Sequence, residues 1–514
     1  MKKIIINEEA WQIRVAITEN GILQNIYFWS RIDNHLERCF FKGLVTKVLP
    51  GIQTAFVDIG QERSGFLHIS EIDRDMALHK LIGDDAESFE AGTGQQESEK
   101  KVRRQPADIS KILNENETIL VQVSKEPVNE KGAKLTTCYT LPGRFIVLMP
   151  NIPRIGISKK IIDRDERTRV KEIISKALPE GMGAIIRTCS QGRSEDEIRK
   201  DVDFLIESWN EIISKEKSSP YGTKIYQDIG LPFQIIRDHL DNDIEQVIID
   251  NHDKQIELVR YVKRVAPEYM LRIHPYTGKN PIFEYFDIEK QIQETLHKKV
   301  ELRSGGSIVI ETTEAMTVVD VNTGRFVGKS NLEDTILKTN LEAAHEIIRQ
   351  LKIRNIGGLI VIDFIDMSLS ANKQKLFHTF EKTLREQDKS QSVVLRVSEF
   401  GLVQMTRKRT GKTLEKQLLR PCIECNGVGR VSSIQTESYA LLRSLKAEFL
   451  RKQITSNALI IKLHPTIFDY ISKNEYETLF EFERKYQCKM ILESDISIAP
   501  HHFKIEPTKQ ITIS

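Results

Sequence analysis

The chain has 514 residues, of which 40% are hydrophobic and 29% are charged, and its formal net charge is +2. This composition is typical of a globular chain, and the length predicts roughly three or four domains. The small net charge excludes a uniformly basic binder of polyanions, so a nucleic-acid site would have to be a local patch.

The start of the chain carries a short apolar run that Glu8 and Glu9 interrupt, which predicts a strand and not a signal peptide. No apolar run approaches the length of a membrane span. Of six cysteines, only Cys422 and Cys425 lie close together in sequence, a pattern typical of a reducing compartment. We therefore expect a cytoplasmic protein.

Residues 1–37 predict a few strands with a turn at Gly21, too few to form a core alone. We expect them to pair with residues 233–296, which carry alternating helix and strand segments.

Residues 38–140 predict a small antiparallel barrel, because short strand-like runs are separated by Pro and Gly. Phe56 and Phe66 fall in its second and third strands, among the cationic residues Lys42, Lys47, Arg63 and His68. Aromatic rings beside cations are how such barrels stack the bases of a single strand, and two core phenylalanines are the alternative. Residues 83–100 are polar and acidic and predict a flexible loop.

Residues 141–232 predict a strand, a helix, a strand that ends at Arg187 and Thr188, and a long amphipathic helix. An arginine fork and a hydroxyl can together hold a phosphate, although two surface side chains are the alternative.

Residues 297–420 contain two apolar runs that end in Asp320 and Asp363, with a helical pattern between them. Strand, helix and strand predict parallel strands, whose carboxyl ends carry both carboxylates to the ligand-binding edge of the sheet. Asn322 and Asp366 add oxygen atoms nearby. Such oxygen ligands suit Mg²⁺, although aspartates that only cap strand ends are the alternative.

A cationic run follows these strands, and it could hold a polyanion beside the metal or be a solvated surface: Arg407, Lys408, Arg409 and Lys412. Next, Cys422 and Cys425 supply half of a tetrahedral zinc site, so the other two thiolates would come from a second copy of the chain. A redox pair or two incidental thiols are the alternatives. Residues 429–514 predict a small α/β unit without a catalytic pattern.

Taken together, these motifs resemble the ribonuclease E/G family of bacterial endoribonucleases over nearly the whole chain. The motifs that carry the resemblance are KGLVTKVLPGIQTAFVDIGQERSGFL, GRFIVLMPNIP, TEAMTVVDVNTGR, NLEAAHEIIRQLKIRNIGGLIVIDFIDM and CIEC. In length the chain is like the shorter members of the family, which lack a long C-terminal scaffold.

The resemblance implies a multidomain α/β fold with an S1 (OB-fold) barrel inserted in a ribonuclease-H-like subdomain. The subdomains are expected at residues 1–37 and 233–296 (ribonuclease-H-like), 38–140 (S1, with the acidic insert 83–100), 141–232 (5′-sensor), 297–420 (DNase-I-like and catalytic), 421–428 (zinc link) and 429–514 (small domain).

The resemblance also implies roles for single residues. The metal-binding aspartates match Asp320 and Asp363, with Asn322 beside them in the catalytic site. The RNA-binding residues of the barrel match Phe56, Phe66 and Lys131. The 5′-monophosphate pocket matches Gly143, Val147, Arg187 and Thr188, and the zinc ligands match Cys422 and Cys425. The family's further pocket arginine is replaced by the stretch around Lys389 and Ser390, and lysine lacks the planar fork of arginine.

We therefore expect an endoribonuclease that uses Mg²⁺ to cut single-stranded, A/U-rich RNA and leaves a 5′-phosphate and a 3′-hydroxyl. The expected substrates are ribosomal RNA precursors and messenger RNA. The expected assembly is a homodimer that shares one Zn²⁺ between two chains, or a dimer of such dimers. The alternative is a non-catalytic RNA-binding protein of the S1 type.

Overall fold

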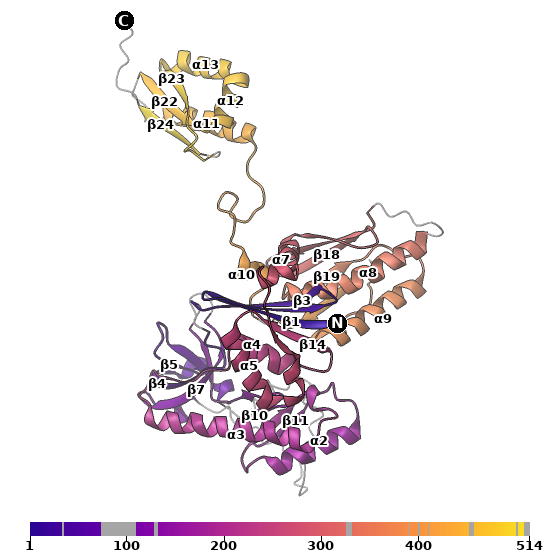
Figure 1. Ribbon diagram of the computed structural model, residues 1–514. Coiled ribbons are helices and arrows are strands. Elements are labelled where there is room, and N and C mark those ends of the chain that lie inside the picture. The colour runs from indigo at the N-terminus through magenta and orange to yellow at the C-terminus, as the bar shows by residue number, and fades with distance from the viewer. Residues whose placement is uncertain are drawn as a thin grey trace. The chain divides into compact units, whose positions relative to one another are not determined.

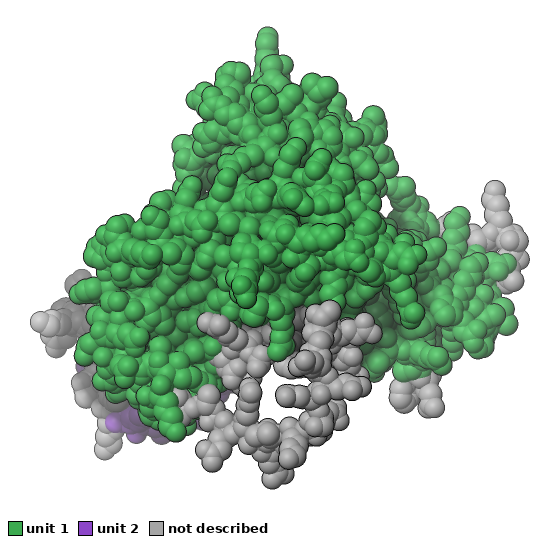
Figure 2. All heavy atoms as spheres, turned by 90° about the horizontal axis from the view of Figure 1, so that it is seen from below, with its two compact units in different colours: residues 1–414 green, residues 415–514 purple. Residues whose placement is uncertain are grey.

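The computed structural model describes residues 1–32, 35–72, 109–127, 132–324, 332–388, 390–398, 401–409, 411–451, 457–499 and 502–507. The expected acidic insert at 83–100 lies outside these residues, as do Lys131 and Lys389. The chain divides into two compact units, residues 1–414 and 415–514, drawn in different colours in Figure 2. Among the described residues, no helix is both long and apolar enough to cross a bilayer.

The N-terminal strands join a five-stranded sheet with a segment more than 200 residues later in the chain (Figure 1). Its order is β15 (Ile273–Pro275), β14 (Ile244–Ile249), β1 (Lys2–Glu8), β2 (Gln12–Glu19) and β3 (Ile22–Ser30). β1 lies parallel to β14 and antiparallel to β2. Alternating isoleucines of β1 therefore face two cores, one with α4 (Leu231–His239) and α5 (His252–Val265), the other with α6 (Ile282–Tyr285) and α7 (Ile288–Leu296).

A closed five-stranded barrel follows. Its order is β4 (Phe40–Leu49), β5 (Thr54–Asp58), β6 (Gly65–His68), β8 (Lys134–Thr136) and β7 (Thr118–Lys125), and β7 pairs back onto β4. The expected barrel is thus present, but it is not wholly antiparallel, because β6 and β8 run parallel. A short strand from later in the chain, β13 (Lys224–Tyr226), also pairs with β4.

The next part of the chain is a four-stranded sheet against two helices. The strands lie in the order β11 (Ile155–Ile157), β12 (Gly183–Ile186), β10 (Ile146–Met149) and β9 (Leu141–Pro142), and the helices are α2 (Arg164–Ala177) and α3 (Glu195–Ser218). Ser194 and Glu197 form a reciprocal capping box at the start of α3, which fixes where that long helix begins.

A separate sheet, formed by β16 to β21, carries the two aspartates. It runs in the order β16 (Lys299–Glu301), β17 (Ser307–Thr312), β18 (Met316–Asn322), β19 (Gly358–Asp363), β21 (Leu402–Arg407) and β20 (Ser392–Val394). β18 and β19 are parallel and are joined by α8 (Leu332–Ile353), as the sequence pattern predicts. α8 and α9 (Ser370–Gln387) lie side by side on one face of this sheet, and their apolar side chains form its core (Figure 1).

The second unit is a small α/β domain. The strands β23 (Lys489–Ser494), β22 (Ala458–Leu463) and β24 (Phe503–Pro507) form its sheet. The helices are α11 (Ile434–Leu450), α12 (Pro465–Asn474) and α13 (Tyr476–Tyr486), and α10 (Leu414–Leu418) lies at the boundary between the units.

Candidate functional site

Asp320 and Asp363 are direct neighbours in the sheet formed by β16 to β21. They are register partners on the parallel strands β18 and β19, so their α-carbons are roughly 5 Å apart. Val319 and Val321 point into the helix-covered core, so the alternating geometry of β18 directs Asp320 to the opposite, open face. Both carboxylates are exposed there.

Two further oxygen-bearing side chains lie beside this pair. The amide of Asn322 donates a hydrogen bond of 2.7 Å to Oδ2 of Asp320. Partial loss of hydration at the sheet edge raises the pKa of the Asp363 carboxyl, and the charges of Asp320 and Asp366 raise it further. Three carboxylates therefore repel one another at this edge, and a divalent cation would relieve that repulsion.

The donor set fits Mg²⁺ with few protein ligands. No group of three or more His, Cys, Asp or Glu side chains converges as a metal cage anywhere in the described part of the chain. Mg²⁺ commonly takes one or two carboxylates and fills its other positions with water and substrate phosphate, which is what Asp320 and Asp363 allow.

Two residues of α8 hold the loop that follows Asp363. Asn340 is fully buried and exchanges two hydrogen bonds with the backbone of Ile365. Glu333 accepts hydrogen bonds from the backbone N–H groups of Ser368 and Leu369. The loop that carries Asp366 is thus tied to the crossover helix on both sides.

The cationic run after β21 does not reach this site. Asp363 pairs with Leu402 at one end of β21, whereas Arg407 pairs with Gly358 at the other end. Arg407 is buried and forms a two-pronged ion pair with Asp388. The idea that Arg407 holds a polyanion beside the metal is therefore wrong, because this arginine ties strand β21 to the end of α9.

Phe56 and Phe66 lie on the outer face of the barrel and not in its core. They are register partners on β5 and β6, and both are partly exposed. The same register continues to Lys47 on β4 and to Lys134 on β8. We call this row of Lys47, Phe56, Phe66 and Lys134 the aromatic row. Two adjoining rings can stack bases, and the exposed Lys47 beside them can attract phosphates, whereas Lys134 is already paired with the carboxylate of Glu71.

The other cations near the phenylalanines have different roles. Lys42 donates to the backbone carbonyl of Glu216 at 2.8 Å and forms an ion pair with its carboxylate, so it ties the barrel to α3. His68 caps the short turn after β6 by accepting a hydrogen bond from the backbone N–H of Ser70. Lys134, which sequence reasoning missed, lies on β8 some 70 residues beyond Phe66, and only the sheet register connects the two.

The four residues expected at the 5′-phosphate pocket come together. Arg187 follows β12 and donates to the carbonyl of Gly143 at 2.6 Å, and Val147 pairs with Ile185 on the neighbouring strand. Gly143 has no room for a side chain, because a Cβ there would lie 2.6 Å from a carboxylate oxygen of Asp201. Thr188 adds a hydroxyl, and the Ser158 hydroxyl lies 3.1 Å from it.

Cys422 and Cys425 lie in an exposed turn of the second unit. The backbone N–H of Gly429 donates to Sγ of Cys425 at 3.2 Å. Hydrogen bonds from Gly429 and Gly427 lower the pKa of the Cys425 thiol, which favours the thiolate that metals bind. The two thiols alone cannot complete a tetrahedral zinc site.

A closed barrel with a partly exposed aromatic row, joined in one chain to a sheet with paired carboxylates, fits a protein of the nucleic-acid-processing class. Comparison with known proteins agrees. The model of the "Ribonuclease E/G family" matches residues 140–410, and that of the "RNase E/G, Thioredoxin-like domain" matches residues 421–508.

Individual relatives extend the match over nearly the whole chain. Ribonuclease G of Escherichia coli K12 is 35% identical over 481 residues, 94% of each chain. Ribonuclease G of Haemophilus influenzae is 36% identical over 473 residues, 92% of each. Ribonuclease E of Escherichia coli K12 is 34% identical and covers 99% of this chain, which spans 46% of that longer protein. The chain therefore belongs to the ribonuclease E/G family, and it is an endoribonuclease.

Proposed function

We propose that this endoribonuclease uses Mg²⁺ held by Asp320 and Asp363 to cut single-stranded RNA. The observation that carries the proposal is the pairing of the two carboxylates in register on parallel strands, with Asn322 hydrogen-bonded to one of them. When bound, Mg²⁺ supplies activation of water for in-line attack and neutralises charge on the phosphodiester.

The chain's own residues supply positioning. Asn322 fixes one carboxylate oxygen of Asp320, and α8 holds the loop with Asp366 at the edge of the site. The aromatic row requires bases that are free to stack, which favours single strands over duplexes. A/U-rich sequences, which unpair readily, and products with a 5′-phosphate and a 3′-hydroxyl follow from the likeness to the family. Ribosomal RNA precursors and messenger RNA are the proposed substrates in a cytoplasmic setting.

The pocket of Gly143, Val147, Arg187 and Thr188 is proposed to bind a 5′-monophosphate. Its support is the convergence of an arginine fork and two hydroxyls beside the backbone turn at Gly143, whose N–H donates to the Ile146 carbonyl. Lys131 is proposed as a further RNA contact of the barrel. Cys422 and Cys425 are proposed to share one Zn²⁺ with a second chain, which makes a homodimer or a dimer of dimers.

Cleavage of a short, fluorescently labelled single-stranded RNA tests the central proposal. We expect internal cuts that require Mg²⁺ and that Asp363→Asn abolishes, while RNA binding persists. Glu311→Gln is the matched control, because Glu311 is an exposed carboxylate on the same sheet that pairs with Lys298. Cuts that persist in Asp363→Asn, or without a divalent cation, would contradict the proposal. RNA that is bound and never cut would favour a binding role for the S1 barrel.

A further inference from the structure

The guanidinium of Arg187 is held from two directions. Nη1 donates to the backbone carbonyl of Gly143 at 2.6 Å, and Nη2 donates to Oδ1 of Asp238 at 2.7 Å. The Arg187 side chain remains 27% exposed. An arginine has five N–H donors, so these two contacts leave the other three for a ligand.

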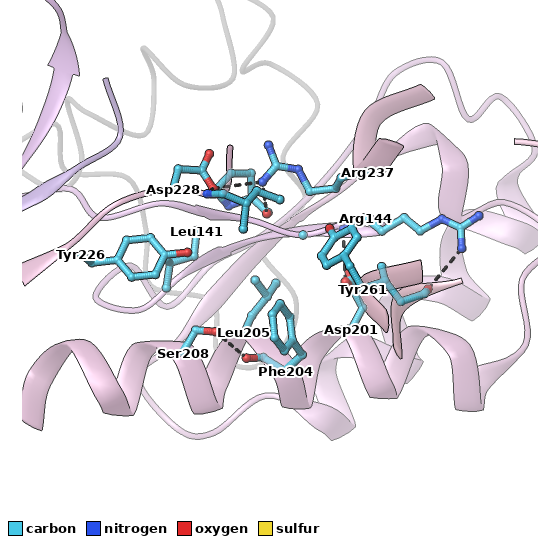
Figure 3. Close-up of a pocket in the computed structure, with 14 residues that line it drawn as sticks. Leu141, Arg144, Asp201, Phe204, Leu205, Ser208, Tyr226, Asp228, Arg237 and Tyr261 are labelled. Carbon is cyan, nitrogen blue, oxygen red and sulfur yellow. Dashed lines mark hydrogen bonds and ion pairs between the residues drawn. The ribbon is translucent and has the colours of Figure 1, made fainter. Parts of the chain in front are cut away.

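Asp238 is itself fixed by a buried arginine. Arg237 is 5% exposed, and its Nε lies 3.5 Å from Oδ1 of Asp238. Nη1 of Arg237 donates to the Pro142 carbonyl and to Asp228. Figure 3 shows Arg237 extended toward Asp228 at a small cavity that Leu141 and Pro142 of β9 help to line. Burial alone would raise the pKa of Asp238, but Arg187 and Arg237 lower it, so the carboxylate stays charged.

We propose that Asp238 is a positioning residue that sets the preference of this enzyme for RNA with a 5′-monophosphate, because it holds the Arg187 fork in the orientation that receives the phosphate. This inference rests on the proposed 5′-phosphate pocket.

The clamp has a clear physical benefit. A free arginine side chain loses rotamer freedom when it closes on a phosphate, whereas an arginine already held at both Nη atoms has lost that freedom before the ligand arrives. The anchoring also leaves enough charge for an anion. Asp238 and Asp228 pair with three arginines, which are Arg187, Arg237 and Arg38, so this group of five side chains keeps a net charge of +1 and still attracts phosphate.

A competing role for Asp238 makes the opposite prediction. If Asp238 only neutralised Arg187, removing its charge would strengthen the binding of a 5′-phosphate. If Asp238 positions the fork, removing its charge weakens that binding. The near-isosteric Asp238→Asn variant therefore separates the two roles by the sign of the effect.

The experiment measures fluorescence anisotropy of a 3′-labelled RNA decamer that carries either a 5′-monophosphate or a 5′-hydroxyl, with the full chain and without Mg²⁺ so that no cleavage occurs. The readout is the dissociation constant for the 5′-hydroxyl RNA divided by that for the 5′-monophosphate RNA, so a large ratio means a strong preference for the 5′-monophosphate. We expect Asp238→Asn to reduce that ratio by about tenfold, the loss that one charge-assisted hydrogen bond would cause. Asp238→Glu, which keeps the charge, should recover part of the preference.

Affinity for the 5′-hydroxyl RNA should be the same in Asp238→Asn and Asp238→Glu as in the unmodified enzyme, which also shows that these two variants are folded. Asp243→Ala is the matched control, because Asp243 pairs with Lys2 at the surface. Equal affinities for both RNAs in the unmodified enzyme would overturn the pocket itself. A preference that Arg187→Ala removes and the Asp238 variants retain would overturn only the positioning role. A stronger preference in Asp238→Asn would show that Asp238 competes with the phosphate.

Discussion

Asn340 of α8 and Ile365 in the loop after Asp363 form a reciprocal pair. The Asn340 amide donates to the Ile365 carbonyl at 2.8 Å and accepts from the Ile365 N–H at 3.1 Å. Asn340 is fully buried, so this pair satisfies both backbone groups where water does not reach. Through it, the crossover helix fixes the loop between Asp363 and Asp366.

We predict that Asn340→Leu loosens this loop. The change leaves two backbone groups unsatisfied, at a cost of about 1–3 kcal/mol each, so the protein should melt earlier and need about tenfold more Mg²⁺ for half-maximal cleavage. Mg²⁺ titration of activity and thermal unfolding measure the two effects. Thr339→Val is the control, because Thr339 is also buried in α8 but bonds only within the helix. An unchanged Mg²⁺ requirement would show that the loop does not need Asn340.

A second prediction concerns binding of the metal itself. In the unmodified protein, saturating Mg²⁺ at about 100 times its dissociation constant should stabilise the fold by about 2.7 kcal/mol. Asp363→Asn should lose that stabilisation. Without Mg²⁺, the variant should melt slightly later, because it relieves the repulsion from Asp320 and Asp366 that raises the pKa of Asp363. Thermal unfolding with and without Mg²⁺ measures both effects, and an equal Mg²⁺-induced shift in the two proteins would exclude Asp363 as a ligand.

Glu333 should make stability depend on pH. Hydrogen bonds from the backbone N–H groups of Leu369 and Ser368 lower its pKa below the usual 4.5. Because the folded-state pKa is depressed, its contribution is complete above pH 4.5 and is lost as the pH falls through the folded-state pKa. Glu333→Gln should therefore lower the melting temperature at pH 7, and the difference should shrink below pH 4.5. A difference that stays constant down to pH 2 would rule out this ionisation.

Much of the fold was predictable from the sequence, because local patterns determine it. The helical spacing between Asp320 and Asp363 predicted a parallel crossover, and the structure places both residues in register. The short strand runs predicted a barrel. The parallel pairing of β6 with β8 was not predictable, because a long stretch of chain separates those strands and no local pattern records which edges meet.

The site was predictable only in part, for the same reason. Arg407 looked like a member of a solvated cationic run, yet it is buried against Asp388, since alternation along β21 turns it to the helix-covered face. Asp238 carried no sequence signal, because its contact with Arg187 joins residues 51 positions apart. Phe56 and Phe66 could have been core residues until the strand register placed them on the outer face.

The aromatic row should account for a large part of RNA affinity. Phe56→Leu or Phe66→Leu removes one stacking surface, worth about 1–3 kcal/mol per base, so each should weaken binding of a single-stranded decamer by about tenfold. Both side chains are partly exposed, so the melting temperature should change little. Anisotropy titration measures the affinity. Phe480→Leu is the matched control, because Phe480 is 45% exposed and lies in the second unit. If all three variants bind RNA as tightly as the unmodified protein does, base stacking on the aromatic row is excluded.

The cysteine turn predicts a metal-dependent assembly. The two thiols of this turn, one of them with a lowered pKa, can complete a four-thiolate zinc site only with a second pair. We expect one Zn²⁺ per two chains, and we expect Cys425→Ser to lose the metal and to halve the mass in solution. Metal analysis and light scattering measure the two quantities. Cys189→Ser is the control, because Cys189 is also a free cysteine but lies in the first unit. Dimers that persist in Cys425→Ser without zinc would show that another surface joins the chains.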